Sequence, residues 1–469
     1  MPRRTRFSPA VLLALLITVA LVAASVVVAV RVIGDDDAES LATPTPTTTT
    51  TPDATTPDST TPDTGGPAGS TPPPAAPSDL PPAQARTVAE LKAQVAEIRG
   101  LQWKADLSIR IVSPEELARR VVELTVAERQ EHLDDQVALE IVLELLQLIP
   151  SDLDLASTID KLLAGGVLGF YDDETRELFV GGDPDSDLDL ATRTTMVHEL
   201  THALTDQHFD FGARNQVLSD EDLGEEAYAL SALLEGDAEL VRALWADEHL
   251  TPDQQLEAEL GSGGADPSVY LDMPPYILES LFFPYLVGVD FVAAIHDAGG
   301  FAAVDNAYRQ PPTSTEEILH PDIYVPGGKW ARPALPDLAA ATGCTAVDTS
   351  TIGEFDMTQV LDRHLGASEA RRAAAGWNGD AYGLVRCGSA AGLAGRWRAD
   401  TPGDLTELAD SLARWAEGWS GSSRPPDADG RFSGPSGSGR IIRAADRVDL
   451  VIAEDASTSD RLSAAVLAA

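Results

Sequence analysis

Two histidines four residues apart constrain this chain more than any other feature. His198 and His202 fall in the stretch 194–208, which reads T-T-M-V-H-E-L-T-H-A-L-T-D-Q-H. On an α-helix, residues four apart leave the same face one turn above the other, so both imidazoles can reach one metal ion. Glu199 lies between them and places a carboxylate where it can act as general base for a water molecule. The sequence therefore predicts a metal site on a helix.

The residues around the two histidines predict a helix that is buried along one side. Asp189 can cap its N-terminus, and neither Gly nor Pro interrupts the stretch. The apolar side is formed by Met196, Val197, Leu200, Ala203 and Leu204. A helix with one buried side and two histidines on another is the arrangement that a metal site requires.

A second long helix is predicted at residues 224–249, in which an apolar run is followed by acidic residues. A catalytic zinc ion takes three protein ligands and keeps one position open, so the two histidines need a third partner. The chain offers Glu235 and Asp237 on the second helix, and His208 later on the first. His208 lies off the helical face that the histidine pair shares, so it ranks last of the three.

With both helices in view, the sequence resembles the thermolysin-like gluzincins, zinc metallopeptidases whose third metal ligand is a Glu on a later helix. The segment E-G-D-A-E at 235–239 looks like their glutamate helix. On that resemblance Glu235 is the third zinc ligand and Glu199 is the general base. Glu239 matches the acidic residue that in the family hydrogen-bonds a ligating histidine. One difference is that no Asn precedes Glu235, as it does in several gluzincin branches.

The resemblance implies a fold and a cofactor. The expected fold is a mainly helical, zincin-like domain of the α+β class with a small sheet, and the expected cofactor is one catalytic Zn²⁺ ion on His198, His202 and Glu235. In zincins an edge strand just before the metal helix pairs with the substrate backbone. The sequence predicts two short strands there, 167–171 and 177–180, joined by a turn. An ordinary structural hairpin explains these strands equally well.

The resemblance also leaves a role open for His320. Gluzincins use a downstream His or Tyr to polarise the oxyanion, and His320 is the candidate for that role here. It follows a short helix whose start is predicted by a capping box of Ser314 and Glu317. The alternative is a hydrogen bond by which His320 holds its loop in place.

The N-terminal residues predict an anchor and a linker. A basic tail at 1–8 precedes an apolar segment at 9–33, long enough at about 1.5 Å per residue to cross a bilayer core of about 30 Å. The charge pattern orients this signal anchor with its N-terminus inside the cell. Cleavage as a signal peptide is the alternative and would give a secreted protein. Residues 34–82 are rich in Thr and Pro and predict a disordered stalk. With either an anchor or a cleaved signal peptide, the rest of the chain is expected outside the cytoplasm.

Two folded units are predicted after the stalk. Residues 83–375 would form the metallopeptidase domain, and 376–469 a small α+β subdomain in which the order strand, strand, helix occurs twice. The predicted strands are 381–387, 393–399, 440–445 and 448–453, and the helices are 402–415 and 457–467. An apolar helix predicted from Pro274 to His296 is interpreted as a core helix or a wall of the cleft, because charged residues and Pro interrupt it.

Three further expectations concern segments outside the two predicted metal-site helices. Residues 104–112 alternate in hydrophobicity as a strand does, and the polar, Gly-rich residues 252–272 predict a surface loop. The Glu and Arg residues of the region 83–150 are interpreted as a solvated face.

Charge and cysteine content limit the partners and the compartment. The formal net charge of -42 argues against binding of nucleic acid, and against binding of anionic lipid by the folded part. Cys344 and Cys387 are expected to pair outside the cytoplasm. Such a bridge would tie the C-terminal subdomain to the preceding region, with a stabilisation of about 4 kcal/mol for a loop of this length.

These features together lead to the expectation of a membrane-anchored, extracytoplasmic, zinc-dependent peptidase. Its partner would be a peptide or protein substrate, with cell-wall peptide among the candidates. A catalytically inactive surface module that binds a cell-wall or protein partner is the alternative, which an absence of bound metal would favour. A structural zinc is a third hypothesis, and it requires a fourth protein ligand such as His208 or Asp237.

Overall fold

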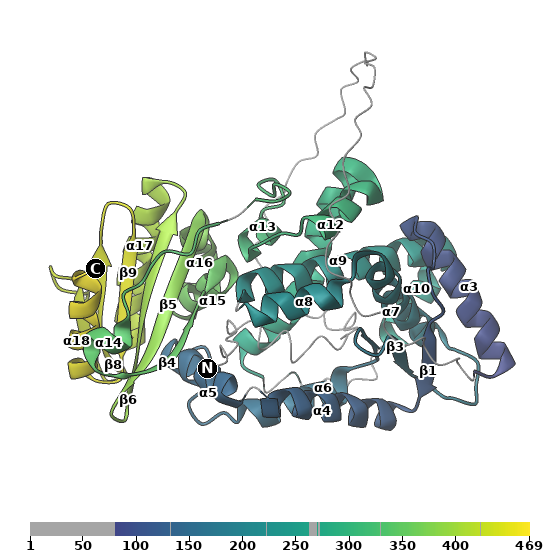
Figure 1. The fold of residues 1–469 in the computed structure, drawn as a ribbon, viewed down its shortest axis with the longest axis horizontal. Helices are drawn as coiled ribbons and strands as arrows, with labels where there is room; N and C mark the ends of the chain where they lie inside the picture. The colour runs from purple at the N-terminus through teal and green to yellow at the C-terminus, as the bar shows by residue number, and fades with distance from the viewer. Residues whose placement is uncertain are drawn as a thin grey trace, which may run out of the picture.

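The computed structural model describes residues 80–469 apart from 132, 222, 262–269, 271–272, 329 and 423. The signal anchor expected at 9–33 lies outside the described residues, as does most of the stalk expected at 34–82. The described chain is a mixed α+β protein with a helical part and a part built on a larger sheet (Figure 1). This agrees with the α+β class predicted from the sequence.

The first part is mainly helical and carries a three-stranded sheet. Its helices are α3 (Pro82–Arg99), α4 (Pro114–Glu131), α5 (Leu133–Leu145), α6 (Leu155–Gly166), α7 (Leu190–Phe209), α8 (Phe211–Asp220), α9 (Gly224–His249), α10 (Pro252–Gly261), α12 (Pro275–Arg309) and α13 (Thr315–Leu319). Its strands are β1 (Ser108–Val112), β2 (Gly169–Asp172) and β3 (Glu177–Gly181), in the order β1-β3-β2. β1 runs parallel to β3, and β2 is an antiparallel edge strand. Both β2 and β3 pack on α7, the helix of the two histidines.

α7 begins at a side-chain cap and is buried against α9. The Asp189 side chain accepts a hydrogen bond from the backbone N of Thr192 at 2.8 Å, which caps the helix as predicted. α9 has the bounds that the sequence predicts, Gly224 to His249. The two helices pack against each other in the core, where His198 and Glu199 are both 0% exposed.

Two glycines allow α9 and α12 to cross at close range. A Cβ atom at Gly236 would lie 2.1 Å from the carbonyl oxygen of Gly288. A Cβ atom at Gly288 would lie 2.2 Å from the carbonyl oxygen of Ala232. Any side chain larger than hydrogen would push the two helices apart. The glycines thus bring α12 against the helix that carries Glu235.

α12 is the apolar helix that the sequence predicts after Pro274. Within the described residues it is the one helix long and apolar enough to cross a membrane, and 56% of its most apolar window is buried inside the protein. Its backbone is not helical at Gly299 and Gly300, and Gly300 has a φ of 65°, so the helix is broken there. Its aromatic side chains pack in the core against α9, as the stacking of Phe283 on Tyr228 shows.

α10 corrects an expectation. Residues 252–272 are predicted as a surface loop, but their first part forms this helix. The side chains of Thr251 and Gln254 each hydrogen-bond the other's backbone N, as in a capping box, and Pro252 is the first helical residue. The local start signal therefore outweighs the polar composition.

The strand predicted from Lys104 begins only at Ser108. The side-chain oxygen of Gln207, on α7, accepts hydrogen bonds from the backbone N of Lys104 at 2.8 Å and of Ala105 at 3.1 Å. These residues therefore bind to the histidine helix before the chain enters the sheet.

The second part is a six-stranded antiparallel sheet with helices on both faces (Figure 1). Its strands are β4 (Thr345–Ser350), β5 (Trp377–Cys387), β6 (Ala390–Ala399), β7 (Arg431–Gly434), β8 (Gly437–Arg443) and β9 (Val448–Ala453), in the order β4-β5-β6-β9-β8-β7. Its helices are α14 (Leu338–Thr342), α15 (Gly353–Leu365), α16 (Ala367–Ala374), α17 (Pro402–Ser420) and α18 (Ala456–Leu467). The strand, strand, helix order occurs twice, as β5-β6-α17 and β8-β9-α18.

The order strand, strand, helix occurs twice and suggests two related halves. The helices of the two units nevertheless pack differently. α17 packs with α15 and α16, whereas α18 packs with α14. The neighbouring residues Leu393 and Ala394 of β6 point to opposite faces. Ala394 clusters with Leu462 of α18, and Leu393 belongs to the cluster that contains Leu412 of α17. The two helices therefore cover opposite faces of the sheet.

The sequence predicts that the second unit starts at residue 376, but the sheet begins before that residue. β4 lies before that residue and pairs with β5. Cys344 and Cys387 form a disulfide with their Cα atoms 4.7 Å apart, at the ends of these two neighbouring strands. The cysteines pair as expected, but the bridge lies within the sheet and does not tie it to the helical part.

Hydrogen bonds join the end of α5 to the second part. Trp419 Nε1 donates to the carbonyl oxygen of Leu145 at 2.6 Å, and Gln147 Nε2 donates to that of Trp419 at 2.8 Å. Arg363 Nε donates to the carbonyl oxygen of Gln147 at 2.9 Å. These bonds fix the sheet and its helices against the helical part.

Candidate metal centre

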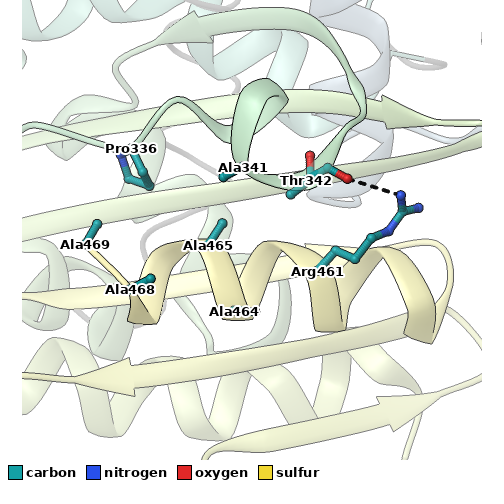
Figure 2. A pocket seen from close by; sticks show the side chains of 8 residues that line it. All are labelled: Pro336, Ala341, Thr342, Arg461, Ala464, Ala465, Ala468 and Ala469. Atoms are coloured by element: carbon teal, nitrogen blue, oxygen red, sulfur yellow. Dashed lines mark hydrogen bonds between the residues drawn. The ribbon is translucent and has the colours of Figure 1, made fainter.

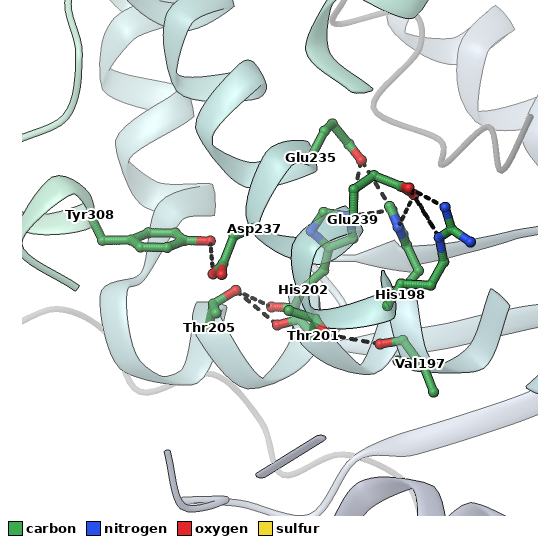
Figure 3. A network of polar contacts seen from close by, with 10 residues as sticks. Val197, His198, Thr201, His202, Thr205, Glu235, Asp237, Glu239 and Tyr308 are labelled. Atoms are coloured by element: carbon green, nitrogen blue, oxygen red, sulfur yellow. Dashed lines mark hydrogen bonds and ion pairs between the residues drawn. The ribbon is translucent and has the colours of Figure 1, made fainter. Parts of the chain in front are cut away.

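His198, His202 and Glu235 meet at one point between α7 and α9 (Figure 3). His198 Nε2 lies 3.1 Å from Glu235 Oε2 and 3.0 Å from His202 Nε2. His202 Nε2 lies 3.3 Å from Glu235 Oε2. In the part of the chain that the structure describes, these three buried residues are the one group of His, Cys, Asp or Glu side chains that could hold a metal ion.

The spacing of the three ligand atoms fits a tetrahedral zinc ion. Zinc binds histidine nitrogen and carboxylate oxygen at about 2.0–2.2 Å, and tetrahedral angles then separate two ligand atoms by about 3.4 Å. The observed separations of 3.0, 3.1 and 3.3 Å are close to this value. Two imidazoles and one carboxylate are also a donor set that zinc takes in catalytic sites.

Glu239 contacts Nδ1 of His198, the ring nitrogen that faces away from the metal position, and Arg242 in turn binds Glu239. Glu239 Oε1 lies 3.0 Å from His198 Nδ1, and Arg242 Nε donates to Glu239 Oε2 at 3.0 Å. Glu239 lies one turn after Glu235, so both carboxylates leave α9 on the side of α7. A carboxylate at Nδ1 fixes the ring and directs the lone pair of Nε2 to the metal position. Glu239 therefore lies beside His198, where the resemblance places it, at ion-pair distance.

Glu199 is buried beside the ligands, next to the edge strand β2. A Cβ atom at Gly169 of β2 would lie 3.2 Å from Glu199 Cγ and 2.9 Å from Thr195 Cγ2, so glycine lets the strand lie this close to α7. Burial raises the pKa of Glu199 to about 7, and the nearby imidazoles limit the rise. A buried carboxylate beside a metal position is suited to accept a proton from water.

The carboxylates and imidazoles of the cluster shift one another's pKa. Burial lowers the pKa of His198, but hydrogen bonds and charge from Glu235 and Glu239 outweigh burial and raise it to about 10. Burial raises the pKa of Glu235, but the charge of His202 and hydrogen bonds from both imidazoles bring it down to about 2. Burial likewise raises the pKa of Glu239, and Arg242 and His198 lower it below its usual range. The cluster therefore stabilises positive charge at its centre.

The other two candidates for the third ligand lie away from the histidines. Asp237 is fully buried and accepts hydrogen bonds from Arg99 Nε at 3.0 and 3.1 Å and from the Tyr308 hydroxyl at 2.9 Å. His208 Nε2 lies 2.8 Å from the carbonyl oxygen of Gln102. Neither belongs to the group that could hold a metal ion. Within the described chain three side chains could thus bind one metal ion together, and a tetrahedral ion bound by them would keep one position open.

His320 lies in the loop after α13 and contacts α15. Its Nε2 is 2.8 Å from Glu354 Oε1, and this hydrogen bond raises the pKa of His320. Ser314 caps α13 as predicted, since its hydroxyl accepts from the backbone N of Glu317 at 3.3 Å. The contact with Glu354 fits the alternative in which His320 holds its loop, and the oxyanion role stays a prediction.

Three residues near the metal cluster were not predicted from the sequence: Arg242, Gly236 and Tyr285. Arg242 could have been found, because it lies three residues after Glu239 on the same helix. Gly236 also carried a signal, since a glycine inside a helical pattern often marks close packing. Tyr285 of α12, whose ring centroid lies 6.2 Å from that of His198, carries no such signal. Its position depends on how α12 crosses the other helices.

Arg99 contradicts the expectation that the Arg residues of 83–150 form a solvated face. It is the last residue of α3 and is 1% exposed. Its burial is explained by Asp237 and Asp305, which approach its guanidinium at 3.0 and 2.7 Å. A buried charge requires such partners.

Two surface pockets lie in the second part of the chain, and neither includes a residue of the metal cluster. One lies between α14 and α18 and is lined mainly by Ala side chains, with Arg461 Nη1 donating to the carbonyl oxygen of Thr342 at 3.4 Å (Figure 2). The other has a volume of about 590 Å³ and lies between residues 332–339 and the strands β4 and β5.

Comparison with known proteins bears on the second part of the chain. Residues 341–463 match a family described as Domain of unknown function (DUF8575). This range begins near the end of α14 and ends in α18, so it covers the six-stranded sheet and most of its helices. None of the curated proteins and none of the solved structures matches the chain.

Proposed function

We propose that this protein is a zinc-dependent peptidase of the gluzincin type, with a zincin-like first part, anchored to the membrane and active outside the cytoplasm. The observation that carries the proposal is the convergence of His198, His202 and Glu235, whose ligand atoms lie 3.0 to 3.3 Å apart, with Glu199 buried beside them. Three ligands with an open position are typical of catalytic zinc, whereas structural zinc takes four. Hydrolysis by an activated water is the chemistry that this arrangement supports best.

The roles in the proposed reaction follow from where the residues lie. His198, His202 and Glu235 would hold the ion, and a zinc ion bound there would act as a Lewis acid toward the scissile carbonyl and the attacking water. Glu199 takes a proton from that water and delivers it to the leaving amine. The edge strand β2 pairs with the backbone of the peptide, in the manner of strand addition. Main-chain pairing accepts many sequences, so proteins and cell-wall peptides are both candidate substrates.

The proposed location rests on the N-terminal segment and on the disulfide. Residues 9–33 have the length and composition of a signal anchor. The pairing of Cys344 with Cys387 fits an oxidising compartment outside the cytoplasm. α12 packs against α9 and is not the proposed anchor.

Zinc content and hydrolysis, measured on the same preparations, test the function. The full chain, purified in detergent, should contain about one zinc per molecule and cleave denatured casein. His202→Ala should lose both the metal and the activity. Glu199→Gln should keep the metal and lose the activity, because the amide cannot take the proton. His208→Ala is the matched control and should keep both.

A folded wild-type chain without zinc would contradict the proposal and leave the surface module in its place. Hydrolysis that persists in zinc-loaded Glu199→Gln would contradict the role of Glu199 as general base.

A further inference from the structure

Opposite sides of α9 have different partners near the ligand Glu235 (Figure 3). Glu235 and Glu239 are four residues apart and lie on the side of α7. Asp237 lies two residues from each, about 200° around the helix at 3.6 residues per turn. In Figure 3 its carboxylate points to Tyr308, away from both glutamates. α9 is therefore held on the side of the metal ligands and on the side behind them.

Side chains from two other helices hold Asp237. Arg99, at the end of α3, donates from Nε to both carboxylate oxygens at 3.1 and 3.0 Å. Tyr308, near the end of α12, donates from its hydroxyl at 2.9 Å. Arg99 is itself bound by Asp305 of α12, at 2.7 Å from Nη1. The side chains of Arg99 and Asp237 are 0% exposed, so water does not screen their attraction.

The same cluster contacts the histidine helix. The ring of Tyr308 stacks on Phe209 of α7, with centroids 4.5 Å apart. Tyr308 also lies beside Thr205 of α7, whose hydroxyl donates to the carbonyl oxygens of Thr201 and His202. Both helices that carry metal ligands thus contact one buried polar cluster.

The contacts that Tyr228 of α9 makes with α12, its stacking on Phe283 and its hydrogen bond to the carbonyl oxygen of Ser280, lie about two turns before Glu235. At Gly236 and Gly288 the two backbones meet without side chains between them. Interdigitating side chains are what normally oppose the rotation of one helix against another. Rotation of α9 would move the Glu235 carboxylate relative to the two imidazoles. It would also pull Asp237 from its donors, which therefore oppose it.

We propose that Arg99, Asp237 and Tyr308 are positioning residues of the metal site, which set the rotation of α9 and so hold Glu235 at ligand distance from the histidines. The inference rests on the proposed zinc site and adds residues that do not touch the metal. It makes α3 part of the architecture of the site, although α3 carries no ligand.

Zinc affinity, measured by competition with a chromogenic chelator, separates positioning from stability. In the full chain, Arg99→Met combined with Asp237→Leu replaces a buried ion pair by apolar side chains, which avoids leaving either charge of the pair alone. Asp305 and the Tyr308 hydroxyl lose these partners, so we expect a somewhat lower melting temperature, and in the folded protein a zinc affinity at least about tenfold lower. The cobalt-substituted form should show a changed visible absorption spectrum.

A second buried pair provides the matched control. Arg396 Nε and Asp449 Oδ1 lie 2.6 Å apart on neighbouring strands of the sheet. Arg396→Met combined with Asp449→Leu should keep the zinc affinity and the cobalt spectrum of the wild type. Tyr308→Phe removes one hydrogen bond to Asp237 and should weaken zinc binding about threefold or more, which covers the case in which the Arg99 double variant does not fold.

Wild-type zinc affinity in both the Arg99 double variant and Tyr308→Phe would overturn the inference while leaving the peptidase function intact. Zinc-loaded wild type without hydrolytic activity, together with weakened affinity in these variants, would support the positioning role and refute the peptidase. A folded wild type that binds no zinc would overturn both.

Discussion

Replacing Gly236 by alanine should separate α9 from α12 and displace Glu235. The added Cβ would lie 2.1 Å from the carbonyl oxygen of Gly288, 2.4 Å from its carbonyl carbon and 2.8 Å from Val292 Cγ2. Carbon atoms in proteins make contact at about 3.5–4.0 Å, so the helices must part by roughly 1 Å. The opposing atoms at Gly288 are backbone and cannot rotate away.

The magnitude follows from two opposing effects. Overpacking of this kind destabilises by about 1–3 kcal/mol, and the better helix propensity of alanine offsets at most about 1 kcal/mol. We expect the free energy of unfolding to fall by about 2 kcal/mol, because the contact is with backbone. A shift of about 1 Å also exceeds the tolerance of a ligand set, about 0.5 Å, so zinc affinity should fall at least about tenfold.

Urea unfolding and chelator competition on Gly236→Ala and Gly403→Ala test this reasoning. Gly403 is an exposed residue in the first turn of α17, where a Cβ would meet Thr401 Oγ1 at 3.4 Å. Gly403→Ala should therefore be neutral or stabilise by up to about 1 kcal/mol and leave zinc binding unchanged. Equal stability and equal zinc affinity in the two variants would refute a role for the glycine crossing.

Three further outcomes are expected. The free energy of unfolding should fall as the pH rises from about 5 to 8, because burial raises the pKa of Asp356 to about 8 and the folded chain keeps a proton that the unfolded chain releases above about pH 4. Asp356→Asn should flatten this dependence in thermal melts, and an unchanged slope would count against it. Cys344→Ala with Cys387→Ala opens a loop with a sequence separation of 43 and should lower the stability of the sheet by about 4 kcal/mol, with zinc content unchanged; loss of zinc would show that the site depends on the bridge. Glu239→Gln should weaken zinc binding about 10–100-fold in chelator competition, and wild-type affinity would argue against its hold on the ligating histidine.

Elements with strong local signals could be predicted from the sequence. The capping of α7 by Asp189 and the bounds of α9 follow from cap residues and apolar periodicity, which act within a few residues. The polar composition of 252–272 predicts a loop and conceals α10, although Thr251 and Gln254 are a local signal for its start. The opposite placement of α17 and α18 could not be predicted, because the order of strands in a sheet is set by long-range pairing.

The site was predictable in part for the same reason. The convergence of His198 and His202 follows from their spacing on one helix. Only the resemblance favours Glu235 over Asp237 as the third ligand. Both are acidic residues on the same predicted helix, and nothing in the neighbouring sequence shows which one faces the histidines. The structure distinguishes them by direction, since they leave α9 on opposite sides. Arg99 could not be assigned from the sequence, because its partners are brought to it by the packing of distant helices.

Near the end of α5, several hydrogen bonds between the two parts use main-chain acceptors. Trp419 and Arg363 donate to the carbonyl oxygens of Leu145 and Gln147, and Gln147 donates to that of Trp419. A carbonyl oxygen is present whatever residue occupies a position, so substitution of Leu145 would leave its hydrogen bond available. Evolutionary drift at an acceptor position is therefore tolerated, whereas drift at a donor side chain breaks the contact.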